Sequence, residues 1–175
     1  MTELECLAYK YDTDKGSHGY CQHYERFIGE FRFLPVTMIE IGVAQGNSLR
    51  MWRQWMPWAT IFGMDINGYE GKETHEFTVM RGHQNEEHDL EELLKVTGKP
   101  NIVIDDAGHD PAHQKTSFNY IFPKMITGGW YVIEDSFGLS TLIDLDSVAG
   151  GNNDIEEFHL ISMNSGDVIG FIKKR

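Results

Sequence analysis

The residues of this chain with the greatest chemical capacity are carboxylates placed at the ends of short apolar segments. Four segments end in acids: Glu40, Asp65, the pair Asp105-Asp106 and the pair Glu134-Asp135. If these segments are neighbouring parallel strands, their carboxyl ends lie side by side, about 5 Å apart. Negative charges at that spacing repel one another and raise their pKa values unless something compensates them. The pattern therefore predicts cationic ligands at one edge of a sheet.

A divalent cation fits between Asp106, Glu134 and Asp135, because oxygen-only ligands select Mg²⁺ or another hard cation such as Mn²⁺ rather than zinc. His109 could be a fourth ligand, but we interpret it as a general base. Its unperturbed pKa of about 6.5 suits removal of a proton from a hydroxyl that a metal has acidified. Each residue alone also fits a plain turn, a helix cap or a surface histidine. Their joint placement favours a site.

A glycine turn follows Glu40. Gly42 and Gly46 lack a Cβ atom, so a ligand could approach main-chain N–H groups there. The spacing differs from the Gly-x-Gly-x-x-Gly dinucleotide fingerprint, and a carboxylate beside a pyrophosphate would repel it. A ligand with a cationic amino-acid part and a nucleoside suits this turn better. Asp65, 19 residues beyond Gly46, could accept hydrogen bonds from a ribose diol, although an acid at a strand end is often only a turn residue.

Alternating strands and helices would position these groups. Apolar runs predict strands at 38–41, 60–65, 76–80, 100–106 and 130–133. Helical patterns begin near Asn47 or Ser48 as N-cap, near His88, and after Asp110-Pro111. The alternation predicts a right-handed, parallel sheet, and residues 157–163 and 168–172 predict an antiparallel hairpin at its end. We expect an α/β fold with a Rossmann-like, mostly parallel sheet and helices on both faces.

The chain is expected to form one domain of residues 1–175. Residues 1–35, rich in aromatic and charged side chains, predict a helix at 21–33 and a flap over the site. Residues 36–175 would form the ligand-binding sheet. Residues 136–157 lack periodicity and predict a loop near the site.

Charge and composition exclude several classes of protein. A net charge of −12 argues against nucleic acid or an anionic membrane as the main partner. No signal peptide and no apolar run of membrane length is present, and Cys6 and Cys21 make no disulfide framework. We therefore expect a cytoplasmic protein with a small-molecule ligand.

Four motifs carry a resemblance to a known family. Glu40-x-Gly42-x-x-x-Gly46 after a strand resembles motif I of the class I S-adenosylmethionine (SAM) methyltransferases. Together with residues 11–17, 104–109 and 131–135, it resembles the metal-dependent sugar O-methyltransferases of the mycinamicin and macrocin type. The similarity spans about residues 9–135. It implies a class I methyltransferase sheet and methyl transfer to a deoxysugar hydroxyl of a small molecule or glycoside.

The resemblance also implies roles for individual residues. The residues implied to contact SAM are Glu40, Gly42, Val43, Gly46, Ser48, Asp65, His83, Gln84 and Asp105, with Asp65 at the ribose and His83 and Gln84 near the adenine. Mg²⁺ or Mn²⁺ would bind Asp106, Glu134 and Asp135, and His109, or otherwise Asp105, would be the base. The implied substrate flap contains Tyr11, Lys15, Tyr20 and Tyr24. His83 replaces the family's usual acid. The chain is also short, so a homodimer partner could complete its pocket.

Three alternatives remain open. Catechol or phenol methyltransferases share the sheet and the metal site, but their second metal motif is Asp-Asn rather than Glu134-Asp135. An oxidoreductase using a nicotinamide or Fe²⁺ would need a further glycine or paired histidines at the metal. A non-catalytic SAM-binding protein would not need Asp106, His109, Glu134 and Asp135 to be intact.

Overall fold

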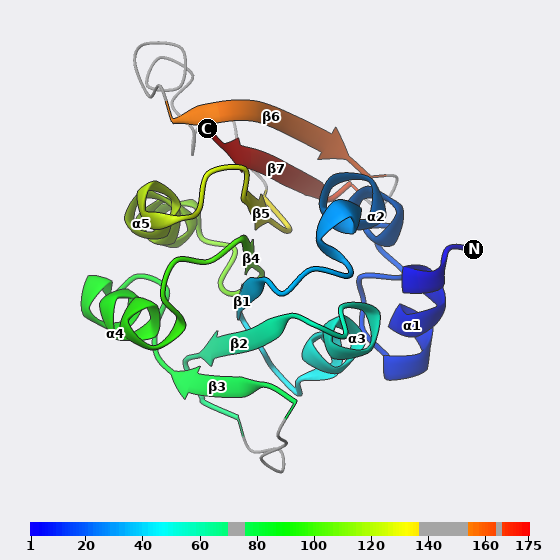
Figure 1. The fold of residues 1–175 in the computed structure, drawn as a ribbon, viewed down its shortest axis with the longest axis horizontal. Helices are drawn as coiled ribbons and strands as arrows, with labels where there is room; N and C mark the ends of the chain where they lie inside the picture. The colour runs from blue at the N-terminus through cyan, green and yellow to red at the C-terminus, as the bar shows by residue number, and fades with distance from the viewer. Residues whose placement is uncertain (70–75, 137–153, 164–165) are drawn as a thin grey trace.

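A seven-stranded sheet forms the centre of the molecule (Figure 1). The computed structural model describes residues 1–69, 76–136, 154–163 and 166–175. The strands are β1 (Thr37–Ile41), β2 (Thr60–Asp65), β3 (Thr78–Arg81), β4 (Ile102–Asp105), β5 (Trp130–Ile133), β6 (Ile155–Ser162) and β7 (Val168–Lys174). Their order is β3-β2-β1-β4-β5-β7-β6, with β1 to β5 parallel and the β6–β7 hairpin antiparallel. The predicted fold class is confirmed. Most of the predicted loop at 136–157 lies outside the described residues.

Helices cover both faces of the sheet (Figure 1). One face carries α1 (Glu3–Tyr11), α2 (Cys21–Ile28), the 3₁₀ turn η1 (Gly29–Phe31) and α3 (Asn47–Trp55). The other carries α4 (Glu87–Thr97), α5 (Pro111–Ile121) and the 3₁₀ turn η2 (Phe122–Lys124). Successive residues of β4 alternate between the two cores: Ile102 and Ile104 pack with α1 to α3, and Val103 packs with α4 and α5. This alternation decides where the side chains of Asp105, the last residue of β4, and Asp106, the next residue, point.

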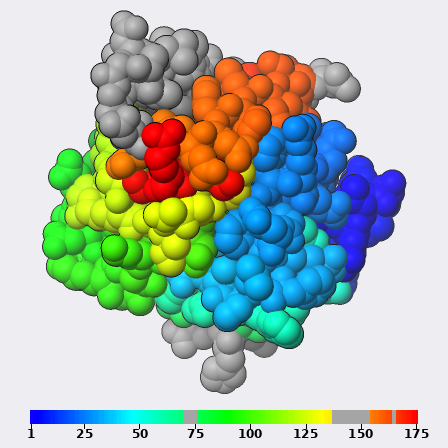
Figure 2. Space-filling model, turned by 45° about the horizontal axis from the view of Figure 1, so that its top comes forward, coloured from blue at the N-terminus to red at the C-terminus, as the bar shows by residue number. Residues whose placement is uncertain are grey.

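The N-terminal segment packs on the sheet as two helices. The helix predicted at 21–33 ends earlier, at Ile28. The helix α1 was not predicted, although Thr2 and Glu5 form a capping box at its start. In α2 the Phe27 ring stacks 4.4 Å from the ring of Phe171, and Figure 2 shows the hairpin beside this segment. Among the described residues, no helix has the length and apolar character needed to cross a membrane. The cytoplasmic location stays a prediction.

The predicted helix caps are partly confirmed. Asp110 caps α5, because its carboxylate accepts a hydrogen bond of 2.8 Å from the Ala112 N–H. For α3 the prediction was wrong: Gly46 is the N-cap residue, with a left-handed φ of 72°, and it makes no side-chain cap. The Ser48 hydroxyl instead donates to Glu40 Oε2 at 2.9 Å. Ser48 thus serves the carboxylate at the strand end rather than the helix terminus.

Candidate functional site

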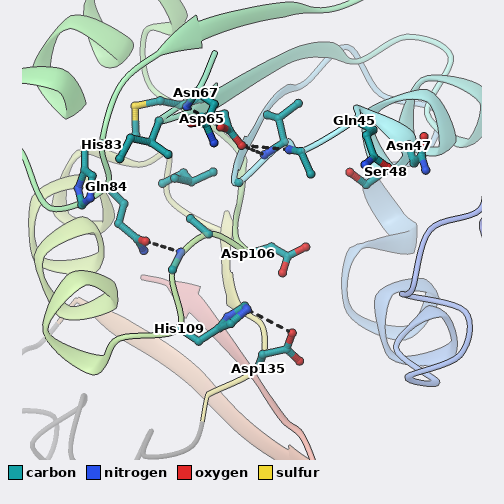
Figure 3. Close-up of a pocket in the computed structure, with 18 of the residues that line it drawn as sticks. Gln45, Asn47, Ser48, Asp65, Asn67, His83, Gln84, Asp106, His109 and Asp135 are labelled. Atoms are coloured by element: carbon teal, nitrogen blue, oxygen red, sulfur yellow. Dashed lines mark hydrogen bonds and ion pairs between the residues drawn. The ribbon is translucent and has the colours of Figure 1, made fainter. Parts of the chain in front are cut away.

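A cavity of about 640 Å³ opens at the carboxyl ends of β1, β2 and β4 (Figure 3). This is the edge at which open α/β sheets bind ligands. The predicted site residues that line it are Gly42, Val43, Ser48, Asp65, His83, Gln84, Asp106, His109 and Asp135. From the predicted flap region, Asp12, Thr13 and Asp14 also reach the cavity. The fold therefore brings predicted site residues from five separate loops to one cavity.

The turn after β1 is held by its neighbours. Gly42 has a φ of 91°, and a Cβ atom there would lie 2.1 Å from the carbonyl oxygen of Asp106. The close approach that requires glycine is therefore made by the loop after β4. The N–H groups of Val43 and Ala44 both donate to Asp65 Oδ2, each at 3.0 Å. Asp65 thus ties two loops together while lining the cavity, and its ribose role stays a prediction.

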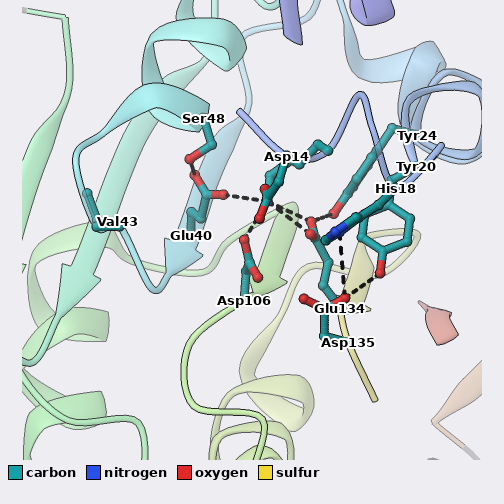
Figure 4. A network of polar contacts seen from close by, with 12 residues as sticks. Asp14, His18, Tyr20, Tyr24, Glu40, Val43, Ser48, Asp106, Glu134 and Asp135 are labelled. Carbon is teal, nitrogen blue, oxygen red and sulfur yellow. Dashed lines mark hydrogen bonds and ion pairs between the residues drawn. The ribbon is translucent and has the colours of Figure 1, made fainter. Parts of the chain in front are cut away.

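A buried lysine lies among the carboxylates. Lys15 is fully buried, and its Nζ atom lies 2.6 Å from Asp106 Oδ2, 2.9 Å from Glu134 Oε1 and 3.3 Å from Glu40 Oε1. Figure 4 shows these three acids converging. Burial alone would lower the pKa of Lys15, but the three negative charges outweigh it and hold that pKa well above its usual value. Lys15 was predicted in a substrate flap, and the structure places its charge inside the protein instead, because the acids need a counter-charge.

The tyrosines of the predicted flap also turn inward. Tyr24 is fully buried and donates its hydroxyl hydrogen bond to Glu134, and the Tyr20 hydroxyl donates to Asp135. Tyr11 donates to a glutamine of α3 and, like Tyr20 and Tyr24, does not line the cavity. Glu134, predicted as a metal ligand, is 1% exposed, and burial raises its pKa well above the usual range. It too does not line the cavity, since its carboxylate is taken up by Lys15 and Tyr24.

Three cavity residues could hold a metal ion. Asp106, His109 and Asp135 each offer a ligand atom, and these atoms lie within 4.8 Å of one another. His109 Nε2 lies 3.8 Å from Asp135 Oδ2, as Figure 3 shows. Asp135 has a left-handed φ of 48°, which is uncommon for a residue with a Cβ atom and is often found at functional sites. The sequence did not indicate that His18 and Asp167 form a second such group with Asp135.

Asp105 lies behind the cavity rather than in it. Its carboxylate accepts hydrogen bonds from Gln84 Nε2 at 2.9 Å, from the Tyr131 hydroxyl at 3.1 Å and from the Ser117 hydroxyl. Burial raises the pKa of Asp105 to about 7. Asp105 is fully buried and does not line the cavity, so its carboxylate has no direct access to a ligand there. Its predicted role as a cofactor contact or base stays a prediction. Gln84 Oε1 also accepts from the Gly108 N–H at 2.6 Å and so anchors the loop that carries His109.

The other predicted cofactor residues divide in the same way. Glu40 is fully buried beneath the glycine turn, and Gly46 does not line the cavity. His83 does line it, with its ring edge-on to His113 at 5.2 Å between centroids. The loops after the strands therefore form the cavity wall, and Glu40 lies buried behind it, where it accepts the Ser48 hydrogen bond.

Two curated relatives match most of this chain. Demethylmacrocin O-methyltransferase of Streptomyces fradiae is 39% identical over 142 residues, which are 76% of this chain and 36% of the relative. L-olivosyl-oleandolide 3-O-methyltransferase of Streptomyces antibioticus is 33% identical over 143 residues, 77% of this chain and 37% of the relative. The chain thus matches little more than a third of the length of these relatives. No family model matches it.

A solved structure matches nearly the whole chain. It is the MycE methyltransferase from the mycinamycin biosynthetic pathway in complex with Mg, SAH and mycinamycin VI. The TM-score is 0.86 at 28% identity, and the match covers 99% of this chain and 53% of MycE. These sequence and structural matches confirm the resemblance that the four motifs indicate.

Proposed function

We propose that this chain, which belongs to the family of mycinamicin- and macrocin-type sugar O-methyltransferases, transfers a methyl group from SAM to a sugar hydroxyl with the help of a divalent cation. One observation carries the proposal. The glycine turn, Asp65 and the group Asp106, His109 and Asp135 all line a single cavity. Its volume of about 640 Å³ lies within the usual range for small-molecule sites. A donor and a metal-assisted acceptor hydroxyl can therefore meet in one space.

SAM would lie across the loops after β1 and β2. Main-chain groups of Gly42 and Val43, with Ser48, would face its methionine part, and Asp65 its ribose. The rings of His83 and His113, which meet edge to face, line the cavity near where the adenine would lie. The SAH in the related MycE complex supports this class of donor.

A hard divalent cation fits Asp106 and Asp135, with His109 beside them. The donor set supports this, because two carboxylates in a cavity suit Mg²⁺ or Mn²⁺. Bound there, the cation would lower the pKa of an acceptor hydroxyl and offset the charge of the alkoxide. The Mg in the MycE complex supports the same class of ion.

His109 is the proposed base. Its side chain is 42% exposed and its Nε2 atom can take the hydroxyl proton, while the carboxylate of Asp135, 3.8 Å away, stabilises the resulting imidazolium. The acceptor oxygen then bonds to the methyl carbon as the carbon–sulfur bond breaks. Sulfur keeps the electron pair, so the products are a methyl ether and S-adenosylhomocysteine. Holding the two reactants in line supplies much of the rate.

The proposed acceptor is a small molecule or glycoside. The net charge of −12 supports this over a nucleic acid. We include a homodimer in the proposal, with a second copy completing the acceptor side. Light scattering coupled to gel filtration tests this part, and a monomer that is fully active would contradict it.

Calorimetry with SAM and S-adenosylhomocysteine, followed by methyl transfer to deoxysugar glycosides, tests the whole proposal. The variant His109→Ala should bind SAM normally and lose methyl transfer by about 10²- to 10⁴-fold. The matched control His88→Ala lies on the exposed side of α4 and should behave as wild type. No binding of either nucleoside would overturn the proposal, and transfer only to catechols would replace its acceptor class.

A further inference from the structure

Gln84 joins the loop after β3 to the loop after β4. Its side chain is almost fully buried, and both ends of its amide are used. Oε1 accepts a hydrogen bond of 2.6 Å from the Gly108 N–H, and Nε2 donates at 2.9 Å to Asp105 Oδ1. A main-chain N–H can only donate, so the Gly108 contact by itself decides which end of the amide faces Asp105. The two partners therefore fix the orientation of Gln84.

Asp105 supports Gln84 from the α5 side of the sheet. While Oδ1 accepts from Gln84, Oδ2 accepts from the Ser117 hydroxyl of α5 and, at 3.1 Å, from the Tyr131 hydroxyl of β5. Donors from a loop, a helix and a strand thus determine the position of one buried carboxylate. The acid does not line the cavity, so any effect that it has on a ligand there passes through Gln84, which does.

The loop that carries His109 is held on both sides of that residue. Gly108 precedes it and is bound by Gln84, and Asp110 follows it and caps α5 through the Ala112 N–H at 2.8 Å. A Cβ atom on Gly108 would lie 3.1 Å from Gln84 Oε1, so glycine allows this close approach. The His109 side chain itself is 42% exposed. Its position therefore depends on the main chain that carries it more than on packing around the ring.

We propose that Asp105 and Gln84 are positioning residues: the buried acid fixes the Gln84 amide, and the amide holds Gly108 so that the neighbouring His109 faces the acceptor hydroxyl. The inference rests on the proposed function and assigns two further residues to it. An error of about 1 Å in the placement of a catalytic group can lower a rate by about 10²-fold. The pair should therefore affect the transfer step more than the binding of the donor.

The substitution Gln84→Met removes both hydrogen bonds and keeps the length of the side chain. We expect kcat for methyl transfer to fall by about 10- to 100-fold, because the base is no longer held in place. The dissociation constant for S-adenosylhomocysteine, measured by calorimetry, should change much less. A loss confined to this affinity, or an unchanged kcat, would overturn the proposal.

Gln54→Met is the matched control. Gln54 also uses its side chain for two hydrogen bonds, from Lys10 at 2.6 Å and from Tyr11 at 2.7 Å, but it belongs to α3 and does not line the cavity. It should behave as wild type in both measurements.

The His109→Ala background separates positioning of the base from a direct contact between Gln84 and SAM. Residues that act as one unit have non-additive effects on a rate. If Gln84 acts through His109, adding Gln84→Met to His109→Ala should lower the residual transfer no further. A second loss as large as that caused by Gln84→Met alone would show that Gln84 acts independently of the base, and would overturn the proposal.

Hydrogen exchange of the Gly108 amide, followed by NMR, tests the anchor without any reaction. In Gln84→Met this amide should exchange about tenfold faster than in wild type, as expected for the loss of one hydrogen bond. In Gln54→Met it should exchange as in wild type. An unchanged exchange rate in a folded Gln84→Met protein would contradict the proposal.

The double variant Gln84→Glu/Asp105→Asn exchanges the roles of the two side chains. The new carboxylate can accept from the Gly108 N–H and from the amide introduced at position 105, whose oxygen can still accept from Ser117 and Tyr131. Gln84→Glu alone places two carboxylates face to face and should lose both slow exchange and transfer, and adding Asp105→Asn should restore them. Equal values with and without Asp105→Asn would overturn the proposal. This comparison also decides the question if Gln84→Met does not fold.

The same measurements separate this inference from the proposed function. A wild-type protein that binds neither SAM nor S-adenosylhomocysteine would overturn the methyltransferase proposal, and Gly108 exchange in the variants would still decide whether the pair holds the loop. Normal binding of S-adenosylhomocysteine with unchanged transfer in Gln84→Met would overturn only the positioning role.

Discussion

Asp105 and Asp106 are adjacent in the chain but lie on opposite faces of the sheet, in different electrostatic surroundings. Asp105 faces the α5 side, where the neutral donors Gln84, Ser117 and Tyr131 contact it. Asp106 faces the cavity and the N-terminal segment, where the ammonium of Lys15 contacts it at 2.6 Å. Strand alternation alone sends them to these two environments. The two acids at the end of β4 therefore have different surroundings and different roles.

The difference shows that a buried carboxylate can be stabilised in two ways, by neutral hydrogen-bond donors or by an opposite charge. Neutral donors orient Asp105, yet burial still raises its pKa to about 7, so it titrates near neutral pH. Lys15 brings a full opposite charge to Asp106, Glu134 and Glu40. Neutral hydrogen bonds suit a residue that only anchors a loop. An opposite charge is needed where several acids share one buried region next to the proposed cation site.

The substitution Lys15→Met should give the largest effect. It leaves buried carboxylates without their counter-charge, and breaking a buried ion pair in this way costs about 3–5 kcal/mol. Urea denaturation at pH 7 with a chelator present measures the free energy of unfolding. A loss no greater than that of an exposed substitution would mean that the acids near Lys15 are protonated and need no cation.

The pH dependence of stability should isolate Asp105. Its pKa in the folded state, about 7, is above the ordinary value of 3.8, so the folded protein holds this proton more tightly. The stabilisation is therefore complete below pH 4 and is lost as the pH rises to 7. Between pH 4 and 8 wild type should lose on the order of 3 kcal/mol more than Asp105→Asn, measured by urea denaturation. Parallel curves for the two proteins would contradict this.

A matched pair of tyrosines compares the two faces directly. Tyr24 donates to Glu134 beside Lys15, and Tyr131 donates to Asp105. Tyr24→Phe should cost about 1.5–3 kcal/mol, as expected for a hydrogen bond to a charged acceptor, because the Lys15 ammonium 2.9 Å from Glu134 favours the charged carboxylate against the effect of burial. Tyr131→Phe should cost about 0.5–1.5 kcal/mol at pH 6, because Asp105 is then mostly neutral. A larger cost for Tyr131→Phe than for Tyr24→Phe would indicate that Asp105, and not Glu134, is the charged acceptor.

The smallest effect is expected for Lys95→Met. Lys95 pairs with Glu91 and Glu92 at distances like those of Lys15, but all three side chains are exposed. Exposed pairs contribute little because water and salt screen them. Urea denaturation should show no difference from wild type beyond experimental error. A measurable loss would show that pairing, rather than burial, sets the importance of Lys15.

The strands and their terminal acids could be predicted because each depends on local pattern. The apolar run before Asp105 and the βαβ alternation were sufficient to place four acidic strand ends at one edge. The capping box of Thr2 and Glu5 was also readable, so α1 could have been predicted. The sequence could not show that Gly46, rather than Asn47 or Ser48, is the N-cap, because all three residue types are common at that position.

The tasks of the individual acids could not be predicted in this way. Lys15 is 91 residues from Asp106 and 119 from Glu134 in the chain, and nothing local marks a lysine in a turn as buried. Its neighbours Asp12, Thr13 and Asp14 line the cavity, so the segment is near the site as expected while the lysine itself points inward. Long-range charge balance, and not local pattern, separates Glu134 from the cavity.

The contact between Gly42 and the Asp106 carbonyl has a consequence for how donor and acceptor are aligned. The turn proposed to lie beneath the sulfur of SAM and the loop that bears the proposed base, His109, touch through their main chains, with no side chain between them. We therefore expect the two loops to shift together, so that the distance between the proposed donor and acceptor sites depends on this main-chain contact. A methyl group at position 42 should push the two loops apart and increase the distance between the donor methyl group and the acceptor oxygen.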